Sequence, residues 1–533
     1  MHSEIYLDAN ATSATLPAAI AAAEDALRER YGNPSSSHAA GLKAKAMLDA
    51  VRSRARRLLG AGAGQLTFTT GATEGIQTAV LSALCDVRAR RQNGEQVGEL
   101  LLYGATEHKA VPESLAHWNR VLGTGLTLQA LPVDGDGRHR LDLLRQLAPR
   151  AALVCTMAAN NETGVISDLA GIEAVLADRA PAALWMVDSV QALGKLRLDL
   201  AATGIDYAPF SGHKLYAPKG IGMLYVRAGA PYTALMAGGG QEGGQRSGTE
   251  NMAGIAALGA VLAALEDGTT FRTHQQLAGF RDDLAAALRH AFPGVVFNMP
   301  FAYSLPTTLN FSVPGLSSGE MLDVFDAAGV RVSAGSACSA AKAGGSYVLD
   351  AMGLPAARSG AAVRMSFGPM ADHAFIAAAC ARIERCGAAL RADCRLPSAG
   401  VIINADTVLC PAIEPDNLLC STPGADTPTD EAIALSPAAL EEFLRNYPDA
   451  CLIDVREGYE HTAGGAPAWH GRSAENVPLS RLPHAIAGWL SGDRPPLVFF
   501  CRGGARSARA AHCLRRLGYQ DAWFVAGGVA LAG

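Results

Sequence analysis

The chain has 533 residues, of which 49% are apolar and 18% are charged, and its formal net charge of −5 fits a soluble globular protein. This length exceeds what one hydrophobic core usually serves, so two or three domains of about 100–200 residues are expected. The charge gives no electrostatic attraction to nucleic acid or anionic lipid, and no apolar run approaches the ~20 residues that cross a bilayer. Since no basic and apolar leader follows Met1, we expect a cytoplasmic protein.

Residues 1–390 alternate short apolar runs with alanine-rich helical stretches. Four of the runs predict buried strands: 100–103, 152–155, 184–187 and 222–226. Together with a predicted helix at 254–266, they indicate an α/β domain built on a largely parallel sheet. The proline-rich stretch 391–432 predicts a linker with some strand content at its start.

Residues 433–533 predict a second, smaller α/β domain, for which about 100 residues suffice. Four elements are expected in it: a helix at 437–446, strands at 451–455 and 497–500, and a helix at 507–517.

The pair formed by Lys214 and Asp188 is typical of a pyridoxal phosphate (PLP) site. An aldehyde cofactor needs an amine for a Schiff base, and its pyridine nitrogen needs a carboxylate to stay protonated. Lys214 lies in the run Ser211–Lys214, one predicted strand and turn beyond Asp188. The competing interpretation is a solvated surface lysine, although the chain holds only seven lysines.

The loop Gly71–Gly75 follows a predicted strand and precedes a helix expected to begin near Ile76. A helix start presents free N–H groups to an anion, so this loop suits the cofactor phosphate, with Thr73 adding a hydroxyl; a plain helix cap is the alternative. His108 follows another strand end, where an imidazole can stack on the pyridine ring and relay protons, or serve a structural role. Gln191 lies one turn beyond Asp188 if that segment is helical.

Eight short motifs occur in order along the chain. They are Tyr6–Thr12, Gly32–His38, Gly71–Gly75, Glu107–Lys109, Asn160–Gly164, Asp188–Gln191, Ser211–Lys214 and Arg246–Asn251. This series resembles the cysteine desulfurases, which are fold type I PLP enzymes of the class V aminotransferase group. The resemblance spans about residues 5–385 and implies a large, mostly parallel sheet domain, a small α/β domain, an L-cysteine substrate and a homodimer.

The resemblance also implies roles for single residues. Lys214 would bind PLP, Asp188 would pair with the ring nitrogen, and His108 would stack on the ring as acid and base. Gln191 and Asn160 would lie near the ring hydroxyl O3′. The phosphate would be held by Ala72, Thr73, Ser211 and His213, with Thr249 reaching across to the other subunit. Arg364 would bind the substrate carboxylate with Asn33 and Asn160, a task that suits a guanidinium fork.

Cys338 lies in the small-residue run Ser333–Ser339, which can present a thiolate. With cysteine as the substrate, Cys338 would attack its sulfur and leave alanine and a Cys338 persulfide. Without the resemblance, a buried small apolar side chain is the alternative.

Cys501 follows the apolar strand 497–500 and opens a helix. Successive backbone N–H groups in such a turn form a nest that favours a thiolate or persulfide. The cradle would consist of Arg502, Gly503, Gly504, Ala505, Arg506 and Ser507. Four residues between Cys501 and Arg506 suit one sulfur better than a phosphate, which argues against a phosphatase or arsenate reductase. Residues 433–533 resemble a single-domain rhodanese.

The sequence thus predicts a PLP-dependent cysteine desulfurase fused to a rhodanese-like sulfurtransferase, with sulfur passing from Cys338 to Cys501. The sequence does not identify the final acceptor, for which an iron–sulfur scaffold, a tRNA-thiolation factor, a molybdenum-cofactor enzyme and a small thiol are the alternatives. Alternatives are a selenocysteine lyase or another class V β-lyase, with the C-terminal domain as a docking module. The spacing of Cys386, Cys394, Cys410 and Cys420 follows no zinc pattern, so no metal is expected.

Overall fold

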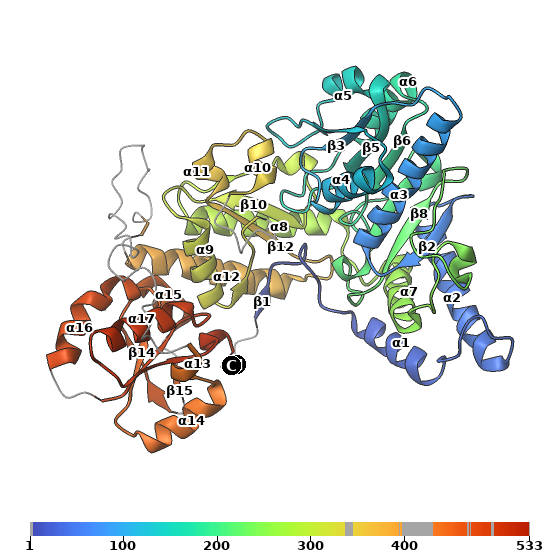
Figure 1. Cartoon of the computed structure of the whole chain (residues 1–533). Helices are drawn as coiled ribbons and strands as arrows, with labels where there is room; N and C mark the ends of the chain where they lie inside the picture. The colour runs from blue at the N-terminus through green and yellow to red at the C-terminus, as the bar shows by residue number, and fades with distance from the viewer. Residues whose placement is uncertain are drawn as a thin grey trace.

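The computed structural model describes residues 4–335, 345–393, 395–396, 430–465, 468–469, 471–491 and 495–531 (Figure 1). Cys338 and most of the predicted linker at 391–432 lie outside these residues. Among the described residues, no helix is both long and apolar enough to cross a membrane.

A seven-stranded sheet forms the centre of the first unit. In spatial order its strands are β2 (Gln65–Thr69), β8 (Gly222–Val226), β7 (Tyr207–Ser211), β6 (Leu184–Asp188), β5 (Ala151–Met157), β3 (Leu100–Gly104) and β4 (Thr127–Leu131). Only β8 runs antiparallel to its neighbours. The predicted largely parallel α/β sheet is therefore confirmed, and the four predicted strands all lie in it.

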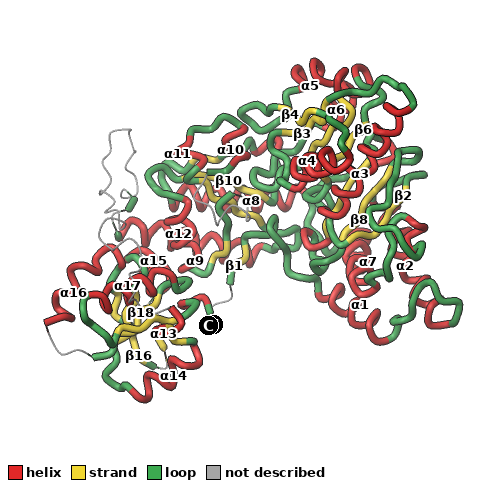
Figure 2. Tube along the Cα trace, viewed as in Figure 1, coloured by secondary structure: helices red, strands yellow, loops and turns green. Residues whose placement is uncertain are grey.

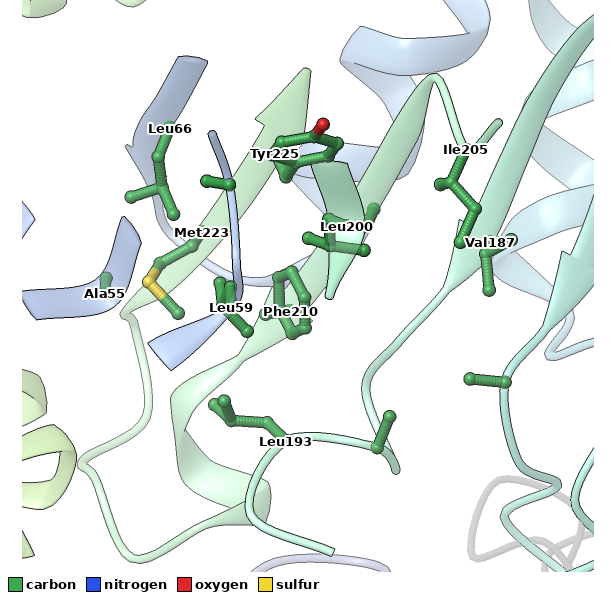
Figure 3. Close-up of a cluster of buried hydrophobic side chains, with 14 of the residues drawn as sticks. Ala55, Leu59, Leu66, Val187, Leu193, Leu200, Ile205, Phe210, Met223 and Tyr225 are labelled. Atoms are coloured by element: carbon green, nitrogen blue, oxygen red, sulfur yellow. The ribbon is translucent and has the colours of Figure 1, made fainter. Parts of the chain in front are cut away.

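Helices enclose this sheet (Figure 2). They are α1 (Pro17–Arg28), α2 (Ala39–Leu58), α3 (Ala72–Gln92), α4 (Ala110–Leu122), α5 (Leu141–Leu147), α6 (Leu169–Arg179) and α7 (Met252–Asp267). Because side chains alternate along a strand, Leu100 and Leu102 of β3 face one apolar cluster while Leu101 faces another. Both faces are thus buried, which explains the continuous apolar runs. Figure 3 shows part of the first cluster, with Leu66, Phe210 and Met223 among its members.

The helix α3 begins at Ala72, so the predicted start near Ile76 is wrong by one turn. The Glu74 carboxylate explains the earlier start, because it accepts hydrogen bonds from the Thr70 N–H and hydroxyl at 2.8 and 2.7 Å. A carboxylate in the first turn also opposes the positive end of the helix dipole.

The second unit has an antiparallel sheet of β9 (Val296–Phe297), β10 (Thr308–Ser312) and β12 (Ala362–Ser366), with β1 (Ile5–Tyr6) paired in parallel to β11 (Val330–Arg331). Its helices are α8 (His274–Ala291), α9 (Ser318–Ala327), α10 (Tyr347–Ala351), α11 (Ala356–Ser359) and α12 (His373–Ala392). The chain's start therefore crosses from this unit into the first one.

The third unit is a parallel five-stranded sheet in the order β13 (Ala434–Leu435), β19 (Ala522–Val525), β18 (Leu497–Phe500), β14 (Cys451–Asp454) and β17 (Glu475–Asn476). A hairpin of β15 (Ala468–Trp469) and β16 (Arg472–Ser473) accompanies it. Its helices are α13 (Asp430–Ile433), α14 (Pro437–Asn446), α15 (Gly458–Gly464), α16 (Leu482–Ser491) and α17 (Ala505–Arg516). All four elements predicted for residues 433–533 are present.

Candidate cofactor and sulfur sites

A cavity of about 440 Å³ opens where β5, β6 and β7 end and α3 begins. This is the carboxyl edge of the parallel strands, where α/β proteins bind ligands. The lining includes eight of the residues predicted for the cofactor and substrate: Ala72, Thr73, His108, Asp188, Gln191, Ser211, His213 and Lys214. Arg364 lines it as well, so residues separated by nearly 300 positions meet at one site.

Lys214 and Asp188 reach this cavity from neighbouring strands. Lys214 lies in a short 3-10 turn after β7, and its Nζ donates to the backbone oxygens of Asn10 and Ala11, both at 2.8 Å. Asp188 ends β6, and its Oδ1 accepts the Val190 N–H at 3.0 Å. Burial raises the pKa of Asp188. A buried carboxylate is stabilised by a cationic partner, which a protonated pyridine ring supplies.

His108 is held as a neutral imidazole. Its Nδ1 accepts the Ala110 N–H at 3.2 Å, which leaves the ring proton on Nε2. Burial lowers the pKa of His108, and the nearby Lys214 and Lys109 ammonium groups lower it further, whereas the Asp188 carboxylate opposes them. A neutral ring that lines the cavity can stack on an aromatic cofactor and exchange a proton.

The phosphate end of the cavity is built from the start of α3 and the end of β7. Ala72 and Thr73 contribute the first free N–H groups of the helix. His213 contacts Thr12 Oγ1 through Nδ1 at 3.2 Å, and burial lowers its pKa to about 4. A Cβ on Gly222 would lie 2.7 Å from Gly71 Cα, so β8 and this loop touch through backbone.

The side chains of Asn160 and Asn161 have different roles in the structure. The Asn160 amide holds its own turn, since Nδ2 donates to the Thr106 oxygen at 3.0 Å and Oδ1 accepts the N–H groups of Glu162 and Thr163 at 2.8 and 2.9 Å. Asn160 does not line the cavity. Asn161 does, and its buried Oδ1 has no hydrogen-bond partner in the described structure. The geometry therefore favours Asn161 for the role that the sequence assigned to Asn160.

Arg364 is fully buried on β12 with its guanidinium at the cavity. Nη2 donates to Asp8 Oδ1 at 2.6 Å and Nη1 to the Asn161 oxygen at 3.1 Å, while the buried Nε has no partner among the described residues. A buried cation next to an open cavity is suited to a substrate carboxylate.

Besides Asn160, two further predicted residues are not brought to this cavity within one chain. Asn33 is exposed, and its Oδ1 accepts the Ser35 N–H at 2.9 Å. Thr249 is also exposed and lies outside the lining. Residues 190–195 form a turn after β6, so Gln191 reaches the cavity without the helical spacing that the sequence suggested.

Sequence reasoning missed the roles of Asn10 and Lys195. Asn10 is buried, its backbone oxygen accepts from Lys214 and from Gln191 Nε2, and its Nδ2 donates to Thr308 Oγ1 at 2.9 Å. Lys195 Nζ donates to Gln191 Oε1 at 2.7 Å and to Asn10 Oδ1 at 3.3 Å. Asn10 belongs to the motif Tyr6–Thr12, but nothing in the spacing of that motif shows that it joins two units.

Cys501 begins a separate site in the third unit. It follows β18 and is buried, and its Sγ accepts the Gly504 N–H at 3.1 Å and lies 3.5 Å from Ser507 Oγ. The turn Cys501–Gly504 leads into α17, so the N–H of the N-cap residue Gly504 faces the sulfur. The side chains of Arg502 and Arg506 instead reach carboxylates, of Asp323 and Glu460 respectively.

Comparisons with known proteins agree with this geometry. The aminotransferase class-V family model matches residues 5–377, and the rhodanese-like domain model matches residues 436–531. Cysteine desulfurases of Gluconacetobacter diazotrophicus and Cereibacter sphaeroides are each 37% identical over 365 residues, which is 68% of this chain and 88% and 90% of theirs.

Solved structures give the same result. A NifS-like protein is 30% identical with a TM-score of 0.63, covering 72% of this chain and 98% of that one. DndA from Streptomyces lividans is also 30% identical, with a TM-score of 0.55 and coverage of 68% and 99%. The cofactor of this family is PLP, and the cavity with Lys214 and Asp188 fits it. The chain therefore belongs to the cysteine desulfurase family of class V aminotransferases and carries a C-terminal rhodanese-like domain.

Proposed function

We propose that this chain transfers sulfur from L-cysteine to Cys338 and then to Cys501, from which an acceptor protein or small thiol takes it. The observation that carries the first half is the shared cavity of Lys214, Asp188, His108 and Arg364. It combines an amine, a buried carboxylate, a neutral imidazole and a buried guanidinium. Together, these four groups suit an amino-acid substrate bound to PLP, whereas none of them alone would indicate one.

The chain's own groups divide the first half-reaction between them. Arg364 and Asn161 bind the substrate carboxylate, and Asp188 and Gln191 orient the cofactor ring. PLP, when bound, withdraws electrons from the substrate Cα. Lys214 Nζ removes the Cα proton, and His108 Nε2–H donates a proton near the ring.

Cys338 receives the sulfur in this proposal. Its thiolate forms an S–S bond to the substrate sulfur while the substrate C–S bond breaks, and the electron pair stays with carbon, which leaves after protonation as alanine. The described residues that flank it lie next to the cavity. Ser346 Oγ donates to Glu162 Oε2 at 2.5 Å, and a Cβ on Gly335 would lie 3.1 Å from the same oxygen. Since Glu162 directly follows Asn161, Gly335 and Ser346 lie close to the proposed substrate site.

The second half of the proposal moves the sulfur to Cys501, whose thiolate attacks the outer sulfur of the Cys338 persulfide and leaves Cys338 as a thiolate. Covalent fusion supports this step, because a tethered acceptor works at an effective concentration near millimolar. Adding L-cysteine to the PLP-loaded protein and mapping persulfides by mass spectrometry tests it. We expect persulfide on both cysteines, with loading of Cys501 lost in Cys338→Ser. Cys501 that stays unmodified while Cys338 is loaded would refute the transfer.

Two further assignments complete the proposal. The chain acts as a homodimer, because Thr249 is exposed and lies outside its own cavity, as a residue that serves the neighbouring subunit must. Its parts are a desulfurase domain at 1–390, a linker at 391–432 and a rhodanese-like domain at 433–533. The protein acts in the cytoplasm and supplies sulfur for iron–sulfur cluster assembly. Analytical ultracentrifugation of the PLP-loaded protein tests the dimer.

A further inference from the structure

The rhodanese-like unit packs on the desulfurase unit through α15. This helix contacts both α9 and α12 (Figures 1 and 2). Tyr459 and Ala463 of α15 are buried in the same apolar cluster as Val324 of α9 and Ile383 of α12. Apolar side chains from two units that share one cluster are typical of a specific interface.

Ion pairs continue this interface to the loop that carries Cys501. Arg502 Nη1 donates to Asp323 Oδ1 of α9 at 2.6 Å, and its Nε lies 3.5 Å from Asp326 Oδ2. Arg506 Nη2 lies 3.8 Å from Asp323 Oδ2. Two arginines of the loop therefore meet two aspartates on one face of α9.

The surroundings of Asp323 favour this pairing. Burial raises the pKa of Asp323, and the nearby Glu460 and Asp326 carboxylates raise it further, while the Arg506 and Arg502 guanidinium groups lower it. Glu460 is itself buried and bidentate to Arg506, at 2.5 and 2.8 Å. Three carboxylates so close together are stable only when the two guanidinium groups lie among them.

We propose that Arg502 and Arg506 form a docking surface for an acidic helix, and that α9 of the same chain occupies it in solution. This deepens the proposed transfer to Cys501 but stands on its own contacts. Cys501 is 2% exposed within the apolar cluster of its own unit, and the side chain of the adjacent Arg502 is held by Asp323 of α9, so the docked helix restricts the approach of a folded acceptor to Cys501.

Charge reversal and charge exchange test the docking in the full-length, PLP-loaded protein. Asp323→Arg places a third guanidinium group opposite Arg502 and Arg506, and like charges at an interface are strongly unfavourable. Adding Arg502→Glu restores an opposite pair. The control is Asp178→Arg, which changes an exposed carboxylate of α6 whose partner is Arg145.

Hydrogen exchange followed by mass spectrometry reports whether the helices stay together. We expect Asp323→Arg to speed exchange in α15 and in α9 by about tenfold or more, the Asp323→Arg/Arg502→Glu double variant to return toward wild type, and Asp178→Arg to match wild type. Unchanged exchange in Asp323→Arg, or no recovery in the double variant while PLP absorbance is retained, would overturn the proposal. If Asp323→Arg does not fold, Arg502→Glu alone tests the same pair from the other side.

Thiol labelling separates docking from sulfur transfer. The ratio of Cys501 labelling by polyethylene-glycol maleimide to labelling by N-ethylmaleimide cancels changes in thiolate content, because both reagents share one chemistry. We expect this ratio to rise about tenfold in Asp323→Arg. An equal ratio in wild type and variant contradicts the restriction of access by α9. Failure of persulfide to reach Cys501 would instead refute the transfer and leave these two results untouched.

Discussion

The amide of Gln191 can present either end to the cavity, and its neighbours decide which. In its protonated form Lys195 Nζ only donates hydrogen bonds, so it holds Gln191 Oε1 at 2.7 Å. Gln191 Nε2 then donates to the Asn10 oxygen at 3.2 Å, which also receives Lys214 Nζ. The orientation of an amide that lines the cavity thus depends on a lysine that does not line it.

The pH dependence of the free energy of unfolding should reflect the titration of Lys195. Burial, together with the nearby Lys214 and Arg364 cations, lowers the pKa of Lys195 from its usual 10.5 to about 7. Between these values the unfolded chain binds a proton that the folded chain does not, so this residue makes stability rise with pH. We expect Lys195→Met to weaken that rise, measured as the denaturant midpoint of the cofactor-free protein across this window. Lys45→Met, which removes an exposed ion pair with Asp49, should keep the wild-type slope.

Arg364 should control substrate affinity. Lysine at this position keeps the charge but loses the guanidinium fork, so one hydrogen bond to the substrate carboxylate is lost. We expect Arg364→Lys to raise KM for L-cysteine about 10- to 100-fold with a smaller effect on kcat, measured as alanine formation. Retained PLP absorbance shows that the site is intact. An unchanged KM would contradict carboxylate binding by Arg364.

Most residues of the cofactor site were predictable because each follows a strand or opens a helix. Asp188 and Thr73 needed only that position and a suitable functional group, whereas Ser211 was assigned through the resemblance. Asn160 and Asn161 were not separable in this way, since adjacent residues of a turn point in different directions and only the observed hydrogen bonds distinguish them.

At the scale of elements, apolar runs located the strands but not their directions. The run 222–226 looks like its parallel neighbours, yet β8 is antiparallel to both β2 and β7. A strand buried on both faces carries no pattern that marks its direction. The contacts of β8 do mark its direction, because they place Gly222 against the backbone of Gly71 in the loop before α3.

Replacing Gly222 should therefore disturb the phosphate loop. A Cβ there would lie 2.4 Å from the Phe210 oxygen and 2.7 Å from Gly71 Cα, and backbone on both sides must shift, at a cost of about 1–3 kcal/mol. We expect Gly222→Ala to weaken PLP binding about tenfold or more, measured by absorbance titration of the cofactor-free protein.

The matched control for Gly222→Ala is Gly279→Ala. Gly279 is exposed within α8, and a Cβ there meets nothing within 4 Å. Alanine should stabilise that helix by about 0.5–1 kcal/mol and leave PLP affinity unchanged. Equal PLP affinity in both variants would show that the contact between β8 and the loop does not position the phosphate.

At the scale of the whole molecule, the contact between the two modules could not be predicted. From the sequence, Tyr459 is expected in the core of its own domain, and Asp323 is expected to be a solvated charge on a helix. Only the folded chain shows that Tyr459 enters the desulfurase cluster and that Asp323 receives Arg502. Interfaces of this kind have nearly the same composition as the surrounding surface, so sequence patterns do not identify the residues that form them.

Transfer within one chain makes a distinct prediction about dilution. In wild type the acceptor is tethered, so the fraction of Cys501 loaded per turnover should not change as the protein is diluted. A mixture of Cys338→Ser and Cys501→Ser chains must meet by diffusion, and its loading of Cys501 should fall in proportion to concentration. Persulfide mapping by mass spectrometry after a brief exposure to L-cysteine measures both. Because subunits of a dimer can exchange partners, the two variants are mixed immediately before cysteine is added. If the mixture loads Cys501 as well as wild type at every dilution, the tether has no part in the transfer, and the sulfur travels between chains or through a free thiol.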